Sequence, residues 1–344
     1  MRFGKSDLDW AVDTGLIDRE AAERLWSALA ARDAERPRFD AAHVAAYAGA
    51  LLVIGAMAWF MTAAWEELGG AGIFAIAAVY MAGFGGFGWR QWRRPGGRLV
   101  GGLLVTIAVA ITPLATYGLL RWTGLWWGGD PGSHTDFHYW IRSGWFTLEA
   151  ATIAVGLAAL RFVRFPFVTA PVAFALWYMS MDLTPILFGD DFEWTARKLV
   201  SLWFGLAMIA AAYVVDRRTR EDFAFWGYLF GLSAFWGGLT LMDSDSEVAK
   251  FGYFLVNLAL ILAAVFLRRR TFVVFGGFGA FGYLGHLASD LFADSFLFPF
   301  VLTGFGVAVI AFGVALRLHG AAWSAELIDA LPSGLRRLRP VERR

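Results

Sequence analysis

Apolar runs of about twenty residues recur along almost the whole chain, separated by short clusters of charged residues. A helix of about twenty apolar residues spans the hydrocarbon core of a bilayer, which is roughly 30 Å thick. Of the 344 residues, 58% are hydrophobic and only 17% are charged. The sequence therefore predicts an all-α, polytopic membrane protein.

About ten of these runs are long enough to be transmembrane helices. They lie at roughly 43–64, 71–89, 99–120, 143–161, 165–182, 198–215, 222–242, 248–267, 271–291 and 296–316. Residues 197–219 also align with residues 249–271, and each segment ends in arginines. This suggests repeated helical hairpins of about 50 residues. Apolar helices also resemble one another by composition alone, so duplication is one of two readings.

Charged residues predict the orientation of these spans. Most of the 30 Lys and Arg residues fall at alternate loops and at both ends of the chain, and the exceptions are Arg121, Arg142, Arg197, Lys198 and Lys250. Positive residues are retained in the cytoplasm, so both termini are expected inside. Abundant arginine and scarce lysine are typical of a bacterium with a GC-rich genome. We therefore expect the protein to be located in the bacterial inner membrane.

Composition excludes several classes of function. A net charge of +1 gives no basic excess that would indicate nucleic-acid binding. The absence of cysteine excludes disulfides, thiolate nucleophiles and cysteine-ligated metals. We expect no cofactor.

Residues 6–32 have the pattern of a short helical hairpin within a cytoplasmic segment, 1–40. Ser6 is expected to cap the first helix, Gly15 to end it, and Asp18 to cap the second. The apolar seam between the helices is expected to comprise Leu8, Val12, Leu16, Ile17, Leu25 and Leu29.

Two stretches near the N-terminus, "LDWAVDTGLIDREAAERL" (8–25) and "AAYAGALLVIGA" (45–56), carry a family resemblance. They resemble the start of the predicted bacterial membrane proteins grouped as domain of unknown function family 2157, over roughly the first 60 residues. The family has no established activity to carry over, so the resemblance implies location and architecture and no catalytic residue. The hairpin then either binds a protein partner or a second copy, or packs on the cytoplasmic loops.

The transmembrane domain is expected over 41–318, and a basic amphipathic tail over 319–344. Trp323, Leu327 and Leu331 are spaced four residues apart, and arginines follow them. This pattern predicts association with anionic membrane lipids, although a plain positive stop also explains it.

A few polar groups lie within the apolar runs, all in the predicted outer half. Ionisable groups in hydrocarbon are costly and need a partner or a water-lined cavity. We predict an outward-facing pocket with Glu149 and His286 as a proton-exchanging pair and Asn257 and Asp182 as orienting groups. The alternative is that Glu149 and His286 bond neighbouring helices, Asn257 makes an interhelical bond, and Asp182 lies at the interface. Asp290 is expected to be interfacial.

Other motifs give weaker predictions. His134, Asp136 and His138 in the loop 129–140 are weak metal-ligand candidates because no fourth ligand is identifiable. Ser233 followed by His286 faintly resembles the order in rhomboid intramembrane proteases, but the predicted direction of the helix is opposite. We therefore expect no enzyme.

These features predict a non-enzymatic membrane protein that transports or senses a small solute or ion through an outward-facing polar pocket. The alternative is a membrane scaffold whose N-terminal hairpin recruits or oligomerises partners.

Overall fold

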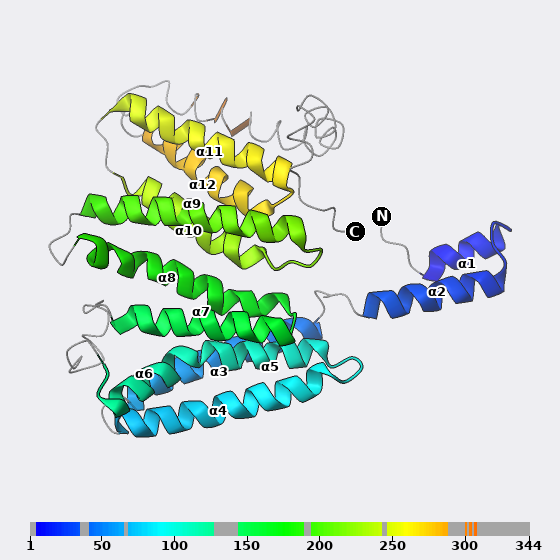
Figure 1. Cartoon of the computed structure of the whole chain (residues 1–344). Coiled ribbons are helices and arrows are strands. Elements are labelled where there is room, and N and C mark those ends of the chain that lie inside the picture. The colour runs from blue at the N-terminus through cyan, green and yellow to red at the C-terminus, as the bar shows by residue number, and fades with distance from the viewer. Residues whose placement is uncertain are drawn as a thin grey trace.

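The computed structural model describes residues 5–34, 41–64, 68–126, 144–188, 194–242 and 246–287, and residues 300, 303, 304, 306 and 307 beyond them. Every regular element in these residues is helical, and no strand occurs among them. Helices α3 to α12 lie side by side in a stack, and α1 and α2 stand apart at one end of it (Figure 1). The predicted all-α class is confirmed.

The N-terminal hairpin consists of α1 (Lys5–Asp13) and α2 (Arg19–Ala34). Gly15 ends α1 with a positive φ of 74°, a conformation that glycine adopts without a steric penalty. Asp18 caps α2 by accepting the backbone N–H of Ala21 at 2.5 Å. Both roles were predicted. Ser6 lies inside α1, which begins at Lys5, so the prediction that Ser6 caps this helix is wrong.

The predicted apolar seam of the hairpin is wrong in part. Ala22 is buried, whereas Leu16, Leu25 and Leu29 are 66%, 46% and 38% exposed. Two short helices share one line of contact, which here follows Ala22, so the larger leucines turn outward.

The first part of the stack contains α3 (Ala41–Ala64), α4 (Gly69–Trp92), α5 (Arg98–Ala110) and α6 (Thr112–Thr123). The sequence predicted one continuous helix over 99–120, but the structure interrupts it at Ile111. Pro113 in the first turn of α6 has no N–H to continue the helical bonding, which explains the break.

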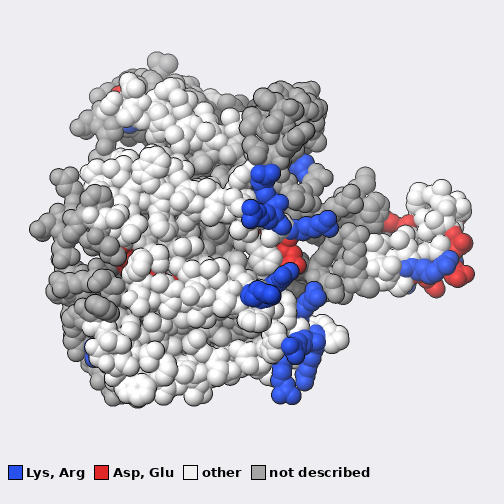
Figure 2. Space-filling view, viewed as in Figure 1, with Lys and Arg blue, Asp and Glu red and all other residues white. Residues whose placement is uncertain are grey.

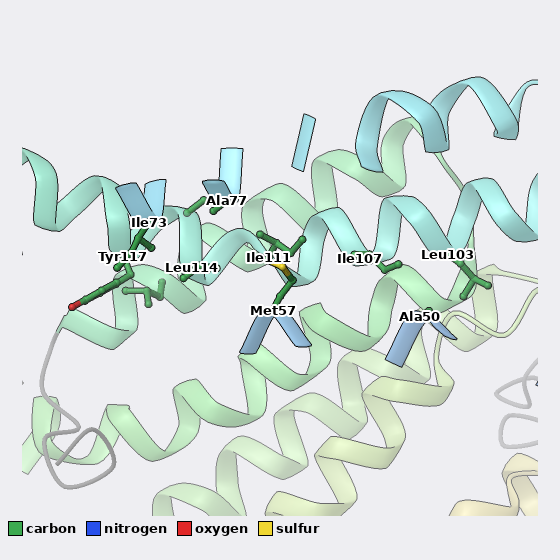
Figure 3. Packing of buried hydrophobic residues seen from close by; sticks show 11 residues of the cluster. Ala50, Met57, Ile73, Ala77, Leu103, Ile107, Ile111, Leu114 and Tyr117 are labelled. Carbon is green, nitrogen blue, oxygen red and sulfur yellow. The ribbon is translucent and has the colours of Figure 1, made fainter. Parts of the chain in front are cut away.

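The core of this part forms around α5 and α6 (Figure 3). Ile111 lies beside Met57 of α3, and Tyr117 of α6 lies beside Ile73 of α4. These side chains are between 1% and 8% exposed. Burial of this apolar set holds α3 and α4 against the central pair.

The next two helices are α7 (Gly144–Phe162) and α8 (Thr169–Phe188), joined through a short 3₁₀ turn, Pro166–Val168. The sequence predicted a span over 165–182 that ended before Pro185. In the structure α8 starts later and continues through Pro185 to Phe188. This shift of the helix end places Asp182 inside the helix instead of at its rim.

The remaining helices are α9 (Trp194–Arg218), α10 (Phe225–Thr240), α11 (Glu247–Leu267) and α12 (Arg270–His286). They form two antiparallel hairpins, α9 with α10 and α11 with α12 (Figure 1). Common ancestry of the two hairpins stays a prediction.

Five described helices are long and apolar enough to cross a membrane. They are Gly69–Trp92, Arg98–Thr123, Trp145–Phe162, Trp194–Arg218 and Glu247–Leu267, where α5 and α6 together count as one membrane-spanning helix. The predicted count of ten is therefore not confirmed. Most of the predicted run 296–316 and all of the tail 319–344 lie outside the described residues.

Most of the described basic side chains gather at one end of the stack, the end nearest α1 and α2 (Figure 2). They come from the ends of α4, α7, α9 and α11 and from the turns that follow. We call this end of the stack the basic end. It is marked by Arg90–Arg98, Arg161, Arg164, Arg217–Arg220 and Arg268–Arg270.

Candidate functional site

Two acidic side chains are buried between α7 and α8. Glu149 lies five residues after the first residue of α7, and Asp182 lies six residues before the last residue of α8. At 1.5 Å per residue, each is about 8–9 Å from the helix end opposite the basic end. Glu149 is 5% exposed and Asp182 is 2% exposed. The two carboxyl groups therefore occupy the same depth, and their side chains interact.

The carboxyl pair has unused hydrogen-bonding capacity. None of its four oxygens completes a hydrogen bond of ordinary geometry with a described residue. Two nearby hydroxyls are already engaged, because Thr152 donates to the Leu148 carbonyl at 2.7 Å and Ser180 donates to the Trp177 carbonyl at 2.6 Å. The buried Thr184 hydroxyl of α8, like the carboxyl oxygens, has no bonding partner among the described residues. Buried polar groups ordinarily have a bonding partner, so this pair retains the capacity to bind a proton or a ligand.

Aromatic and basic groups surround the pair. Trp145 and Tyr178 each lie one helical turn from one of the carboxyl residues, and their ring centroids are 6.4 Å apart. Arg197 of α9 is close enough for its positive charge to act on Asp182. Its guanidinium also lies 5.4 Å from the centroid of the Trp194 ring. The site thus contains two carboxyl groups, a phenol and a nearby positive charge.

This arrangement restricts which charge states the pair adopts. An ionised carboxylate in a membrane interior is costly, and two adjacent carboxylates are not both ionised without compensation. The pair can hold a shared proton or a small cation. Within the described residues no group of three or more His, Asp or Glu side chains could hold a metal ion.

His286 lies elsewhere. Its Nε2 is 3.3 Å from both carboxylate oxygens of Glu247, which also accepts a bond from Lys250 Nζ at 2.8 Å. These residues join the start of α11 to the end of α12. In the stack α8, α9 and α10 lie between α7 and α12 (Figure 1), so the structure does not bring His286 to Glu149.

Asn257 occupies a third position, in the hairpin of α11 and α12. Its Oδ1 accepts the Trp236 indole N–H at 3.1 Å, and its Nδ2 donates to the Tyr253 carbonyl at 2.8 Å. The side chain is fully buried and packs on Gly279. Asn257 therefore makes an interhelical hydrogen bond, which was one of the two roles that the sequence analysis considered for it. The other was that of an orienting group in the outward-facing pocket.

Some sequence predictions lie outside the described residues. These are the metal-ligand candidates His134, Asp136 and His138, and the interfacial candidate Asp290. Ser233 is described, and its hydroxyl donates to the Leu229 carbonyl at 2.9 Å.

Sequence reasoning missed one polar cluster at the basic end. Arg269 bonds Asp216 through Nε at 3.0 Å and Nη2 at 2.5 Å, and it bonds Asp222 through Nη1 at 2.7 Å. Burial lowers the pKa of Arg269, but its bonds to Asp216 and Asp222 outweigh this effect and raise the pKa above its ordinary value. The available clue was an aspartate directly before the arginines that end the run 198–215.

Residues 9–117 match the family model of predicted membrane proteins with a domain of unknown function, number 2157. The match confirms the resemblance seen in the sequence and extends it through α3, α4, α5 and half of α6. Glu149 and Asp182 lie beyond the matched segment. No curated protein and no solved structure matches the chain.

Proposed function

We propose that this chain is a non-enzymatic protein of the bacterial inner membrane that transports or senses protons through the Glu149–Asp182 pair. Both termini are then cytoplasmic, because the basic end is the end that remains inside. The pair accordingly lies in the outer half of the membrane. The observation that carries the proposal is two buried carboxyl groups that interact with each other and whose four oxygens complete no hydrogen bond of ordinary geometry with a described residue.

The proposed cycle begins with one proton shared between the two carboxyl groups, which leaves one negative charge. Arg197 compensates this charge from the start of α9. Uptake of a second proton from the outer side makes the pair neutral and removes its attraction to Arg197. The contact between α8 and α9 then weakens, which couples protonation to a change in helix packing.

Two further observations favour this pair over the pocket expected from the sequence. Glu149 and Asp182 are both buried, whereas His286 contacts a Glu247 side chain that is 52% exposed. Asn257 already has two partners. Glu149 and Asp182 therefore combine burial with free bonding capacity, which marks proton and ion routes in membrane proteins.

Proton flux into liposomes tests the proposal. Purified protein is reconstituted in vesicles that contain a pH-sensitive dye, and an acid pulse is applied outside. We expect Glu149→Gln and Asp182→Asn each to lower the flux at least about tenfold, because an amide does not titrate. Glu247→Gln is the matched control, since it removes a carboxylate near the same end of the stack that is largely exposed.

A sensor need not conduct protons, so a second measurement covers that case. Infrared difference spectra between acidic and alkaline buffer should show the C=O band of a protonated carboxyl group. The band should shift or lose intensity in Glu149→Gln and in Asp182→Asn, because each variant removes one of the two carboxyl groups, and it should be unchanged in Glu247→Gln. Wild-type flux and spectra that both variants reproduce would overturn the proposal.

We propose a membrane scaffold as the second candidate function, because the hairpin exposes large apolar side chains. Trp10 and Leu16 are 61% and 66% exposed, and α1 and α2 stand apart from the stack (Figure 1). Exposed apolar groups on a helical surface favour protein contacts.

Deletion of residues 1–36 tests this second candidate. If the hairpin mediates self-association, the deletion variant should be smaller than the wild type in light scattering from the same detergent. The double variant Trp10→Ser/Leu16→Ser should show the same loss. Equal oligomeric masses for all three proteins would contradict self-association through the hairpin.

A further inference from the structure

An apolar groove of about 470 Å³ lies between α4, α5 and α7. Gly85 and Trp89 of α4 line it, together with Ala108 of α5 and Val155 and Phe162 of α7. The indole of Trp89 carries the single polar side-chain atom among all its lining residues. A groove without placed polar groups has no means of orienting a polar solute, so its surface is suited to a hydrocarbon chain.

The groove begins at the basic end and follows the helices inward. On α4 its lining extends from Trp89 back to Met81, and on α7 from Phe162 back to Val155, with Val163 directly after the helix. Eight residues of helix correspond to about 12 Å. One leaflet of a bilayer contributes about half of the roughly 30 Å hydrocarbon core. The groove therefore covers most of the depth of the leaflet at the basic end.

Two arginine-rich segments that contain no acidic residue adjoin the groove at Trp89 and Phe162. The segments 89–98 and 161–165 contain six arginines and no Asp or Glu, and these arginines are Arg90, Arg93, Arg94, Arg98, Arg161 and Arg164. The other two basic segments, 216–222 and 268–270, also carry six arginines but include Asp216, Glu221 and Asp222. These two segments beside the groove thus carry no negative charge of their own, whereas the other two basic segments do.

One contact connects the charged rim with the groove. The Arg93 guanidinium lies 4.4 Å from the centroid of the Trp89 ring. Trp89 in turn meets Phe162 edge to face, with ring centroids 6.1 Å apart. Because Trp89 and Phe162 both line the groove, an anion bound at Arg93 would lie directly above a hydrocarbon chain in the groove.

We infer that this groove binds an acyl chain of a phospholipid whose anionic headgroup contacts Arg93 and the neighbouring arginines. A lipid supplies both chemistries at the required spacing, a negative headgroup at the membrane surface and a chain below it. The inference is independent of the proposed role of Glu149 and Asp182, because none of the lining residues belongs to that pair.

Native mass spectrometry of protein released from nanodiscs tests the inference. The nanodiscs contain equal amounts of phosphatidylglycerol and phosphatidylcholine with the same acyl chains. We expect the wild type to retain phosphatidylglycerol several-fold over phosphatidylcholine. Equal retention of the two lipids would overturn the proposal.

Two glycine variants of α4 test the groove itself. A Cβ at Gly85 would be 3.9 Å from the Ala108 Cβ, an ordinary contact, so a side chain can start there without a clash and Gly85→Leu should occupy part of the groove. Gly83→Leu is the control, because a Cβ there has no described atom within 4 Å and Gly83 is not a lining residue. Gly85→Leu should lose the retained lipid, and Gly83→Leu should keep it. Equal retention by both variants would contradict a groove site.

Two arginine variants test the headgroup contact without changing the core. Arg93→Gln should reduce the preference for phosphatidylglycerol to near equality. Arg217→Gln is the control, because Arg217 also lies over an aromatic ring, that of Tyr213 at 5.8 Å, but belongs to a basic segment that also contains acidic residues. An unchanged preference in Arg93→Gln would overturn the headgroup assignment.

A different outcome would assign the groove to another occupant. If the wild type retains no lipid and forms a dimer that dissociates in Gly85→Leu, the groove joins two copies of the chain.

Discussion

Arg269 holds the carboxylate of Asp216 with two nitrogens, Nε at 3.0 Å and Nη2 at 2.5 Å, although the residues are 53 positions apart in the sequence. The Asp216 side chain is 2% exposed and the Arg269 side chain is 11% exposed. A third bond joins Arg269 to Asp222. The cluster therefore ties the end of α9 to the turn before α12.

The first prediction concerns this ion pair. Asp216→Leu removes one partner and leaves a largely buried guanidinium, so we expect the free energy of unfolding to fall by about 3–5 kcal/mol. The double variant Asp216→Leu/Arg269→Met removes both charges and should regain part of that loss. Reversible unfolding in mixed micelles measures both changes. A double variant less stable than Asp216→Leu would contradict the prediction.

The second prediction concerns the packing of Asn257 against Gly279. A Cβ at Gly279 would collide with the Asn257 side chain, which would have to give up its bonds to Trp236 and Tyr253. We expect Gly279→Ala to destabilise the protein by about 1–3 kcal/mol. Gly277→Ala on the same helix meets no described atom within 4 Å and should be neutral or stabilising by up to about 1 kcal/mol. Thermal unfolding in detergent compares the two, and a similar loss in both would disprove the packing argument.

The third prediction concerns the turn of the N-terminal hairpin. Gly15 has a φ of 74°, where a side chain costs about 1–2 kcal/mol. Gly15→Ala should therefore speed amide hydrogen exchange in residues 5–34 and leave the stack unchanged. Gly15→Asn should have a smaller effect, because asparagine tolerates this conformation better. If the amide groups of residues 5–34 exchange at the same rate in the wild type and in both variants, this turn does not limit the stability of the hairpin.

Local patterns predicted several parts of the fold. Gly15 and Asp18 act as the sequence indicated, because helix stops and caps depend on residues within one turn. The expected boundaries of α8 were wrong, since proline was read as the end of a helix. Pro185 lies inside the last turn of α8, which continues to Phe188. Asp182 is therefore a buried residue within the helix and not the interfacial residue at its end that the sequence suggested.

The sequence named both residues of the candidate site, Glu149 and Asp182, but it paired Glu149 with His286 instead of Asp182. Glu149, Asp182, Asn257 and His286 were recognised as polar groups in apolar surroundings, which is a property of the sequence. Their partners depend on which helices are neighbours. Because α7 packs on α8, Glu149 meets Asp182, and because α11 packs on α12, His286 meets Glu247.

By itself the sequence determined the helical class, the hairpin turn and the alternation of basic loops, because length, hydropathy and charge act locally along the chain. Only the tertiary structure decided which buried groups meet. Helix contacts in a membrane depend on close packing of small residues and on a few polar bonds, and the order of apolar residues along one helix does not encode its neighbours. The pairing of Glu149 with Asp182, the clamp on Asp216 and the groove beside Trp89 all arise at that level.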